Sequence, residues 1–203
     1  MSRQFLLKKA LPVLLAALLV CLLALVLRVR LEQRRLAACM IRLHVVAASD
    51  APADQERKLQ VRDALLPVLQ TLTAGCASAD EAEIRLRQGL PELRAAAEAA
   101  LKAGGEELRL SLSRERFPRR DYPTFSLPAG AYRALRVTIG PGKGHNWWCV
   151  AFPALCLAGD GDEFSDAARA AGFSDDQVEL MQADTPVVRF KFRLLDWLEA
   201  WFG

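Results

Sequence analysis

Residues 40–48, with the sequence MIRLHVVAA, decide the fold of this chain. Their apolar and β-branched side chains are typical of a strand. Ser49, Asp50 and Pro52 come directly afterwards. Ser and Asp are favoured at helix N-caps and Pro is tolerated in a first turn, so we expect a helix to follow the strand at once.

Periodicity predicts the next elements along the chain. Leucines recur on one side of residues 53–73, and a second helical pattern covers residues 79–103. We expect Pro67 and Pro91 to kink or split these helices, because proline lacks the backbone donor that a helix interior needs. Three further segments have strand-like alternation or composition, namely 107–117, 131–139 and 147–157.

The last part of the chain differs in character. A polar, acidic stretch covers residues 159–185, and an amphipathic helical pattern covers residues 187–202. One face of that last helix carries Phe190, Leu194, Trp197 and Trp201, and it is widened by Leu195, Leu198 and Phe202. We expect this face to cover the sheet, because a small sheet needs a helix over its apolar side. Docking of the helix on a membrane or a protein partner is the alternative.

The order of these elements predicts the fold class. A strand, two helices, three strands and a helix indicate an α+β domain, with a small, mostly antiparallel sheet covered by helices. The first strand could join a later strand in parallel.

An apolar run precedes this domain. Residues 10–27, ALPVLLAALLVCLLALVL, form 18 uncharged positions, enough as a helix to cross most of a bilayer. Arginines rather than a small-residue cleavage site follow the run, which favours an uncleaved transmembrane helix. We therefore expect residues 1–39 to be a cytoplasmic stub, a membrane anchor or signal segment, and a linker. Residues 40–203 are expected to form an extracytoplasmic signalling domain.

The charge distribution argues against nucleic acid as a partner. The chain has 27 Lys and Arg against 24 Asp and Glu, and residues 1–35 contain seven of the basic residues but one acidic residue. Residues 36–203 therefore carry 20 basic and 23 acidic side chains. Because nucleic-acid binding needs clustered cations that displace counterions, we predict no DNA or RNA partner.

The motifs that could support catalysis are weak. Ser49, Asp50 and His44 have the residue types of a hydrolytic triad, but the G-x-S-x-G elbow is absent and helix capping is favoured. The Gly-rich loop at 140–144 lacks the P-loop pattern, so a hairpin-like loop between strands is favoured. The histidines and cysteines lack zinc-ligand spacing. We predict a binding domain with no catalytic residue, cofactor or metal.

Two tryptophans follow the Gly-rich loop. Neighbours on a strand point to opposite faces, so we expect one of Trp147 and Trp148 in the core and the other near the surface. An exposed tryptophan is a favoured interface anchor. The candidate partner-binding residues are Lys143, His145, Asn146, Trp147 and Trp148.

Cys149 and Cys156 form a possible local pair. Pro153 lies between them and could bend the strand, bringing the two sulfur atoms together. A disulfide is plausible outside the cytoplasm, and two buried thiols are the alternative.

Two stretches of the chain resemble the stage II sporulation protein R family. They are IRLHVVAASDAPADQERKLQVRD at 41–63 and PAGAYRALRVTIGPGKGHNWWCVAFPALC at 128–156. The shared motifs are HV-x-A-x-SD, KL-x-VRD and G-x-G-x-NWWCV-x-FP-x-LC.

This resemblance implies a non-enzymatic signalling protein of endospore-forming bacteria, made in the forespore and exported to the intermembrane space. The implied partner is a membrane-embedded aspartyl protease that removes the pro-sequence of sporulation sigma factor E. The protein would be anchored through residues 10–27 or released on the extracytoplasmic side. The alternative function is an extracytoplasmic cell-envelope hydrolase that uses Ser49, Asp50 and His44.

Overall fold

A four-stranded sheet forms the centre of the computed structural model, which describes residues 3–101, 106–155, 161–182 and 186–202. Its strands are β1 (Ile41–Val46), β2 (Leu108–Phe117), β5 (Gly130–Ile139) and β6 (Asn146–Phe152). Across the sheet their order is β2-β5-β1-β6, and the short strands β3 (Arg120–Asp121) and β4 (Ser126–Leu127) pair separately. The predicted α+β class, with a small sheet and helices, is confirmed.

β1 occupies the middle of the sheet and is buried along its whole length. It pairs in parallel with β5 and antiparallel with β6, while β2 pairs antiparallel with β5. The sheet is therefore mostly antiparallel, and the first strand joins a later strand in parallel.

The 140–144 loop is not a hairpin, because β1 lies between the two strands that the loop connects. The loop instead crosses the end of β1. There the backbone amides of Lys143 and Gly144 donate hydrogen bonds to the carbonyls of Ala48 and Ala47, at 3.1 and 3.0 Å. A Cβ atom on Gly144 would lie 2.2 Å from the carbonyl oxygen of Ser49, so the close approach requires glycine.

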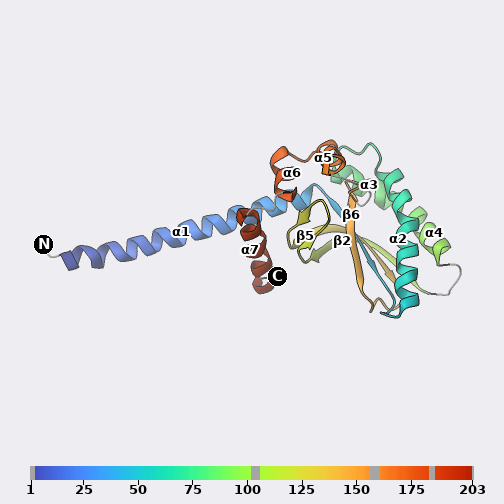
Figure 1. The fold of residues 1–203 in the computed structure, drawn as a ribbon, viewed down its shortest axis with the longest axis horizontal. Coiled ribbons are helices and arrows are strands. Elements are labelled where there is room, and N and C mark those ends of the chain that lie inside the picture. The colour runs from blue at the N-terminus through green and yellow to red at the C-terminus, as the bar shows by residue number, and fades with distance from the viewer. Residues whose placement is uncertain (1–2, 102–105, 156–160, 183–185, 203) are drawn as a thin grey trace.

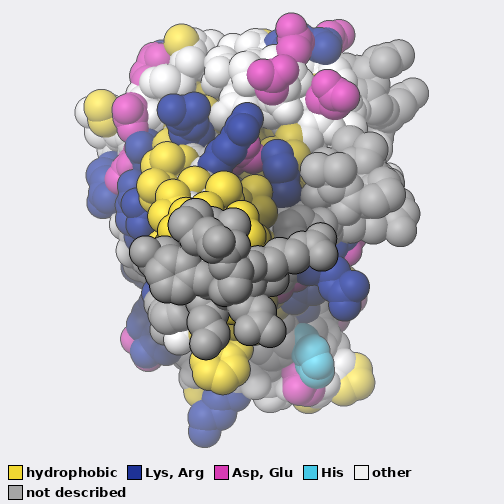
Figure 2. Space-filling view, turned by 90° about the vertical axis from the view of Figure 1, so that its left-hand side faces the viewer, with side chains coloured by type: hydrophobic (Ala, Val, Ile, Leu, Met, Phe, Trp, Pro, Cys, Tyr) yellow, Lys and Arg dark blue, Asp and Glu magenta, His cyan; other side chains and the backbone are white. Residues whose placement is uncertain are grey.

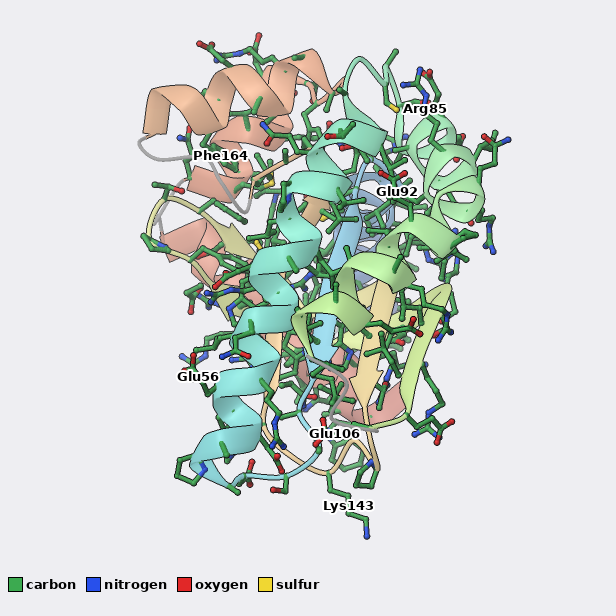
Figure 3. The ribbon with its side chains drawn as sticks, turned by 90° about the vertical axis from the view of Figure 1, so that its right-hand side faces the viewer. Glu56, Arg85, Glu92, Glu106, Lys143 and Phe164 are labelled. Atoms are coloured by element: carbon green, nitrogen blue, oxygen red, sulfur yellow. The ribbon has the colours of Figure 1, made fainter. Side chains whose placement is uncertain are left out.

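Three helices cover one face of the sheet, and Figure 3 shows them in front of the strands. They are α2 (Pro52–Thr73), α3 (Ala79–Gln88) and α4 (Leu90–Ala100). The break expected near Pro91 is present, because α3 ends before Gly89 and α4 begins at Leu90. The expected split at Pro67 is wrong: α2 continues through it. Buried Leu65 and Leu69 lie on either side of Pro67, and their packing holds the helix together.

The long helix α1 (Arg3–Ala38) contains the apolar run and projects away from the sheet (Figure 1). Its segment Leu11–Ala38 is long and apolar enough to cross a membrane, and its side chains before Val29 are almost all exposed. The last turns differ, because Val29, Leu36 and Ala37 are buried and α1 packs against β5. One helix therefore provides both the expected membrane span and part of the core.

Two further helices occupy the polar, acidic stretch, where no helix was expected. They are α5 (Gly161–Ala170) and α6 (Asp175–Gln182). Phe164 and Ala168 are buried on α5, and Val178 and Met181 are buried on α6. Their helical spacing is present in the sequence, but the many acidic residues around it obscured the pattern.

The last helix, α7 (Pro186–Phe202), packs against α1 and against strand β5 of the sheet. Phe192, Leu195 and Leu198 are its buried residues among those described, whereas Trp197 and Trp201 are 53% and 72% exposed. The expectation that the tryptophan face covers the sheet is therefore wrong. α2, α3 and α4 occupy one side of the sheet, and α7 buries Leu195 and Leu198 from the edge of its predicted apolar face against α1 and β5.

Arg42 is fully buried on β1. Its guanidinium lies 4.1 Å from the ring centroid of Phe117 and 5.1 Å from that of Tyr132, and Nη2 donates to the Tyr122 hydroxyl at 2.6 Å. Nε and Nη1 make no hydrogen bond to the residues that the structure describes. Burial lowers the pKa of Arg42 because the charged form loses its hydration.

We expect Arg42→Met to keep the free energy of unfolding within about 1 kcal/mol of the original, because an apolar side chain of similar length removes the cost of burying a charge. Arg42→Ala should lower it by about 2–5 kcal/mol, because it leaves a cavity. Urea unfolding of both variants checks this. Equal losses in the two variants would show that the charge itself stabilises the fold.

Candidate partner-binding site

A cavity of about 600 Å³ lies where the 140–144 loop meets the start of β6. All five predicted partner-binding residues line it, together with Asp50, Arg120 and Tyr122. Lys143, His145 and Asn146 are exposed to solvent. The fold thus gathers this set in one place, and their role in binding stays a prediction.

Asp50 connects the segment that follows the 140–144 loop to the start of α2 through hydrogen bonds. Its carboxylate accepts a hydrogen bond from the backbone amide of His145 at 2.6 Å and contacts the Nδ1 atom of the same residue. Lys58 of α2 adds a bond from its Nζ to the His145 carbonyl at 3.2 Å. The bond from the His145 side chain holds the pKa of Asp50 below its usual range.

Trp147 and Trp148 point to opposite faces of β6, as the strand geometry predicts, but both are half-buried. The Arg62 guanidinium of α2 lies 5.2 Å from the Trp147 ring. Trp148 lies 5.6 Å from the ring of His44, and the Arg120 guanidinium lies 3.6 Å above it. Neither ring is fully buried, because they lie at the start of edge strand β6, where the strand is only partly covered, whereas residues 149–152 are buried.

The three residues proposed for a hydrolytic triad are not assembled. Both ring nitrogens of His44 already have partners, Glu115 and Asn146, each at 2.9 Å. The Ser49 hydroxyl donates to Asp54. Asp50 binds the loop as described above, so the described structure contains no Ser49–His44 pair.

Neither Ser49 nor Asp50 is the N-cap of α2, contrary to the expectation. Ala51 is the N-cap of α2, and no side chain caps that helix. Ser49 accepts a hydrogen bond from the Ala51 amide at 3.1 Å, which orders the turn before the helix. Within the described ranges, no group of three or more His, Cys, Asp and Glu side chains could hold a metal ion.

The cysteine prediction is resolved only in part. Cys149 is buried on β6, whereas Cys156 lies outside the described residues, so their pairing stays a prediction. Cys21, Cys39 and Cys76 are free thiols.

The contact between Asp50 and His145 should depend on pH. A carboxylate with a lowered pKa stabilises the folded loop above its unfolded pKa, and that stabilisation is lost as the pH falls through the folded pKa. We expect tryptophan fluorescence to change below the usual aspartate range, and Asp50→Asn to abolish this transition. Glu56→Gln, at an exposed position on α2, is the control. An unchanged acid transition in Asp50→Asn would contradict the assignment.

Known proteins resemble the part of the chain that contains this cavity. The family model of stage II sporulation protein R matches residues 37–161. A relative named stage II sporulation protein R, from Bacillus subtilis (strain 168), is 38% identical over 119 residues. That match covers 58% of this chain and 53% of the relative, so it spans about half of the relative's length. No solved structure matches.

The residues matched by the family model include all six strands and every residue that lines the cavity. The apolar run of α1 and the whole of α7 lie outside them. Because the match covers more than half of the chain, the chain belongs to the stage II sporulation protein R family.

Proposed function

We propose that this protein is an exported sporulation signal that activates a membrane-embedded aspartyl protease, which then removes the pro-sequence of sigma factor E. In this proposal α1 anchors the chain, and residues 40–203 act on the extracytoplasmic side, in the intermembrane space. Family membership supports a role in sporulation. The observation that carries the proposal is that motif residues 146–148 line a solvent-accessible cavity.

The contacts within the site favour binding over hydrolysis. A serine hydrolase needs its nucleophile within hydrogen-bond reach of a base. Here the Ser49 hydroxyl is bonded to Asp54, and the His44 ring lies between Glu115 and Asn146. These bonds make a rigid polar scaffold behind the cavity, which suits a surface that recognises another protein.

The charges around the cavity indicate an acidic partner segment. The two lining carboxylates are already engaged, because Asp50 accepts from His145 and Asp121 accepts from Arg119. Lys143 makes no side-chain hydrogen bond to the described residues, and Figure 3 shows it extending away from the body of the protein. Together with Arg120 over Trp148, it offers cations and an aromatic ring to a segment with acidic and apolar side chains.

Charge reversal at Lys143 tests this site. We expect Lys143→Glu to reduce processing of a pro-sigma reporter by about tenfold or more, because a like charge then faces the acidic partner. The assay is co-expression of the full chain with candidate membrane aspartyl proteases, scoring reporter cleavage.

Lys143→Arg is the matched control and should keep processing near the original level. Thermal melting of both variants should be unchanged, because exposed substitutions alter stability by about 0.5 kcal/mol or less. Normal processing with Lys143→Glu would place the partner surface elsewhere.

The proposed side of the membrane is tested separately. Glu56 is exposed on α2, whereas the thiol of Cys76 is buried and therefore poorly suited to labelling. We expect a membrane-impermeant maleimide to label Glu56→Cys above the level of the unsubstituted chain in intact, non-sporulating cells that express the protein, because their extracytoplasmic side faces the medium. Labelling only after the cells are opened would contradict export.

A further inference from the structure

Two exposed tryptophans lie next to each other on α7. Outside α1, the large apolar side chains exposed in the described part of the chain are Ile84, Trp197 and Trp201. The centroids of the two indole rings are 6.1 Å apart. Together they form an exposed apolar patch.

This patch lies beside the end of the expected membrane span. Figure 1 shows α7 crossing α1, and two contacts fix the crossing point. Lys191 forms an ion pair with Glu32 at 2.8 Å, and Arg30 donates to the carbonyl of Leu198 at 3.5 Å. Glu32 lies only about 7–8 Å along the helix axis beyond Leu27, the last apolar residue of the run.

The tryptophans are exposed and lie on the side of α7 away from buried Phe192 and Leu195. Successive residues of a helix are rotated by about 100°, so Trp197 and Trp201 lie opposite buried Leu195. In Figure 1 the sheet lies on one side of α7 and the apolar run lies on the other. With a helix radius of about 5–6 Å including side chains, α7 itself lies close to the level at which the run ends.

Basic side chains surround the same place. Arg28, Arg34 and Arg35 of α1 and Arg193 of α7 are all exposed. Figure 2 views the molecule from the side on which α1 projects and shows Lys and Arg side chains around the hydrophobic side chains of α1, which is seen end on. Tryptophans at the headgroup level and cations against anionic headgroups are the two features of a protein surface in contact with a bilayer.

We propose that α7 is an interfacial helix. Trp197 and Trp201 insert among the headgroups of the same membrane that α1 spans, and the basic residues around them contact anionic phospholipids. The proposal goes beyond protease activation and rests only on the anchoring of α1 in the membrane. With two contacts instead of one, the domain has a fixed orientation relative to the bilayer surface.

Quenching of tryptophan fluorescence tests this in the full chain. The protein is reconstituted in vesicles of equal parts phosphatidylglycerol and phosphatidylcholine, with bromine on the acyl chains of the phosphatidylcholine. α1 contains no tryptophan, so all of the tryptophan fluorescence comes from the folded domain. We expect quenching of the original chain and of W147F/W148F, and loss of most of that quenching in W197F/W201F. Replacing phosphatidylglycerol by unbrominated phosphatidylcholine, at the same bromine content, should weaken the quenching.

Co-flotation with the vesicles separates the possible failures. If the chain floats but its quenching is absent, or is the same in W197F/W201F, the interfacial helix is excluded while the anchor stands. If the chain does not float, both proposals are wrong. A blue shift of Trp197 and Trp201 that grows with protein density, without quenching, would assign the patch to a second copy of the chain and overturn the lipid contact.

Discussion

The architecture depends on the complete burial of β1. This strand has neighbours at both edges, β5 and β6, and is covered on both faces. α2, α3 and α4 cover the apolar face, whereas the other face places Arg42 and His44 inside the protein. The rings of Phe117 and Tyr132 pack against the Arg42 guanidinium, and Glu115 forms a hydrogen bond with His44. Much of the remaining chain is arranged to enclose one short segment.

The candidate site follows from where β1 ends. The carbonyls of Ala47 and Ala48 just beyond the strand bind the 140–144 loop, and the same stretch leads into α2. Asp50 and Lys58 then hold His145 from the helix side. The motifs around residues 44–50 and 142–148, distant in the sequence, therefore form one structural unit. Their interdependence explains why the recognisable residues of this chain gather around a single cavity.

Elements whose residues follow a single clear local pattern could be predicted from the sequence. Features that depend on tertiary packing could not. β1, the alternation of β2 and the break ahead of Pro91 are local signals. The continuity of α2 through Pro67 depends on core contacts made by residues on either side. The insertion of β1 between β5 and β6 is a long-range pairing that no local pattern reveals. On α7, the periodicity predicted a wide apolar face that includes Leu195 and Leu198, but it could not show that only this edge would be buried while Trp197 stays exposed.

The passage of α1 directly into the core makes the domain a spacer of defined length. Only Cys39 and Met40 separate α1 from β1, and the helix is packed on β5 before it ends. The helical rise from residue 28 to residue 38 is about 15 Å and β1 adds about 17–20 Å, so the cavity lies a limited distance from the end of the apolar run. If α1 anchors the chain in a membrane as proposed, the cavity can reach only a target that lies within that distance of the bilayer. The width of the gap between two facing membranes would then determine whether contact occurs.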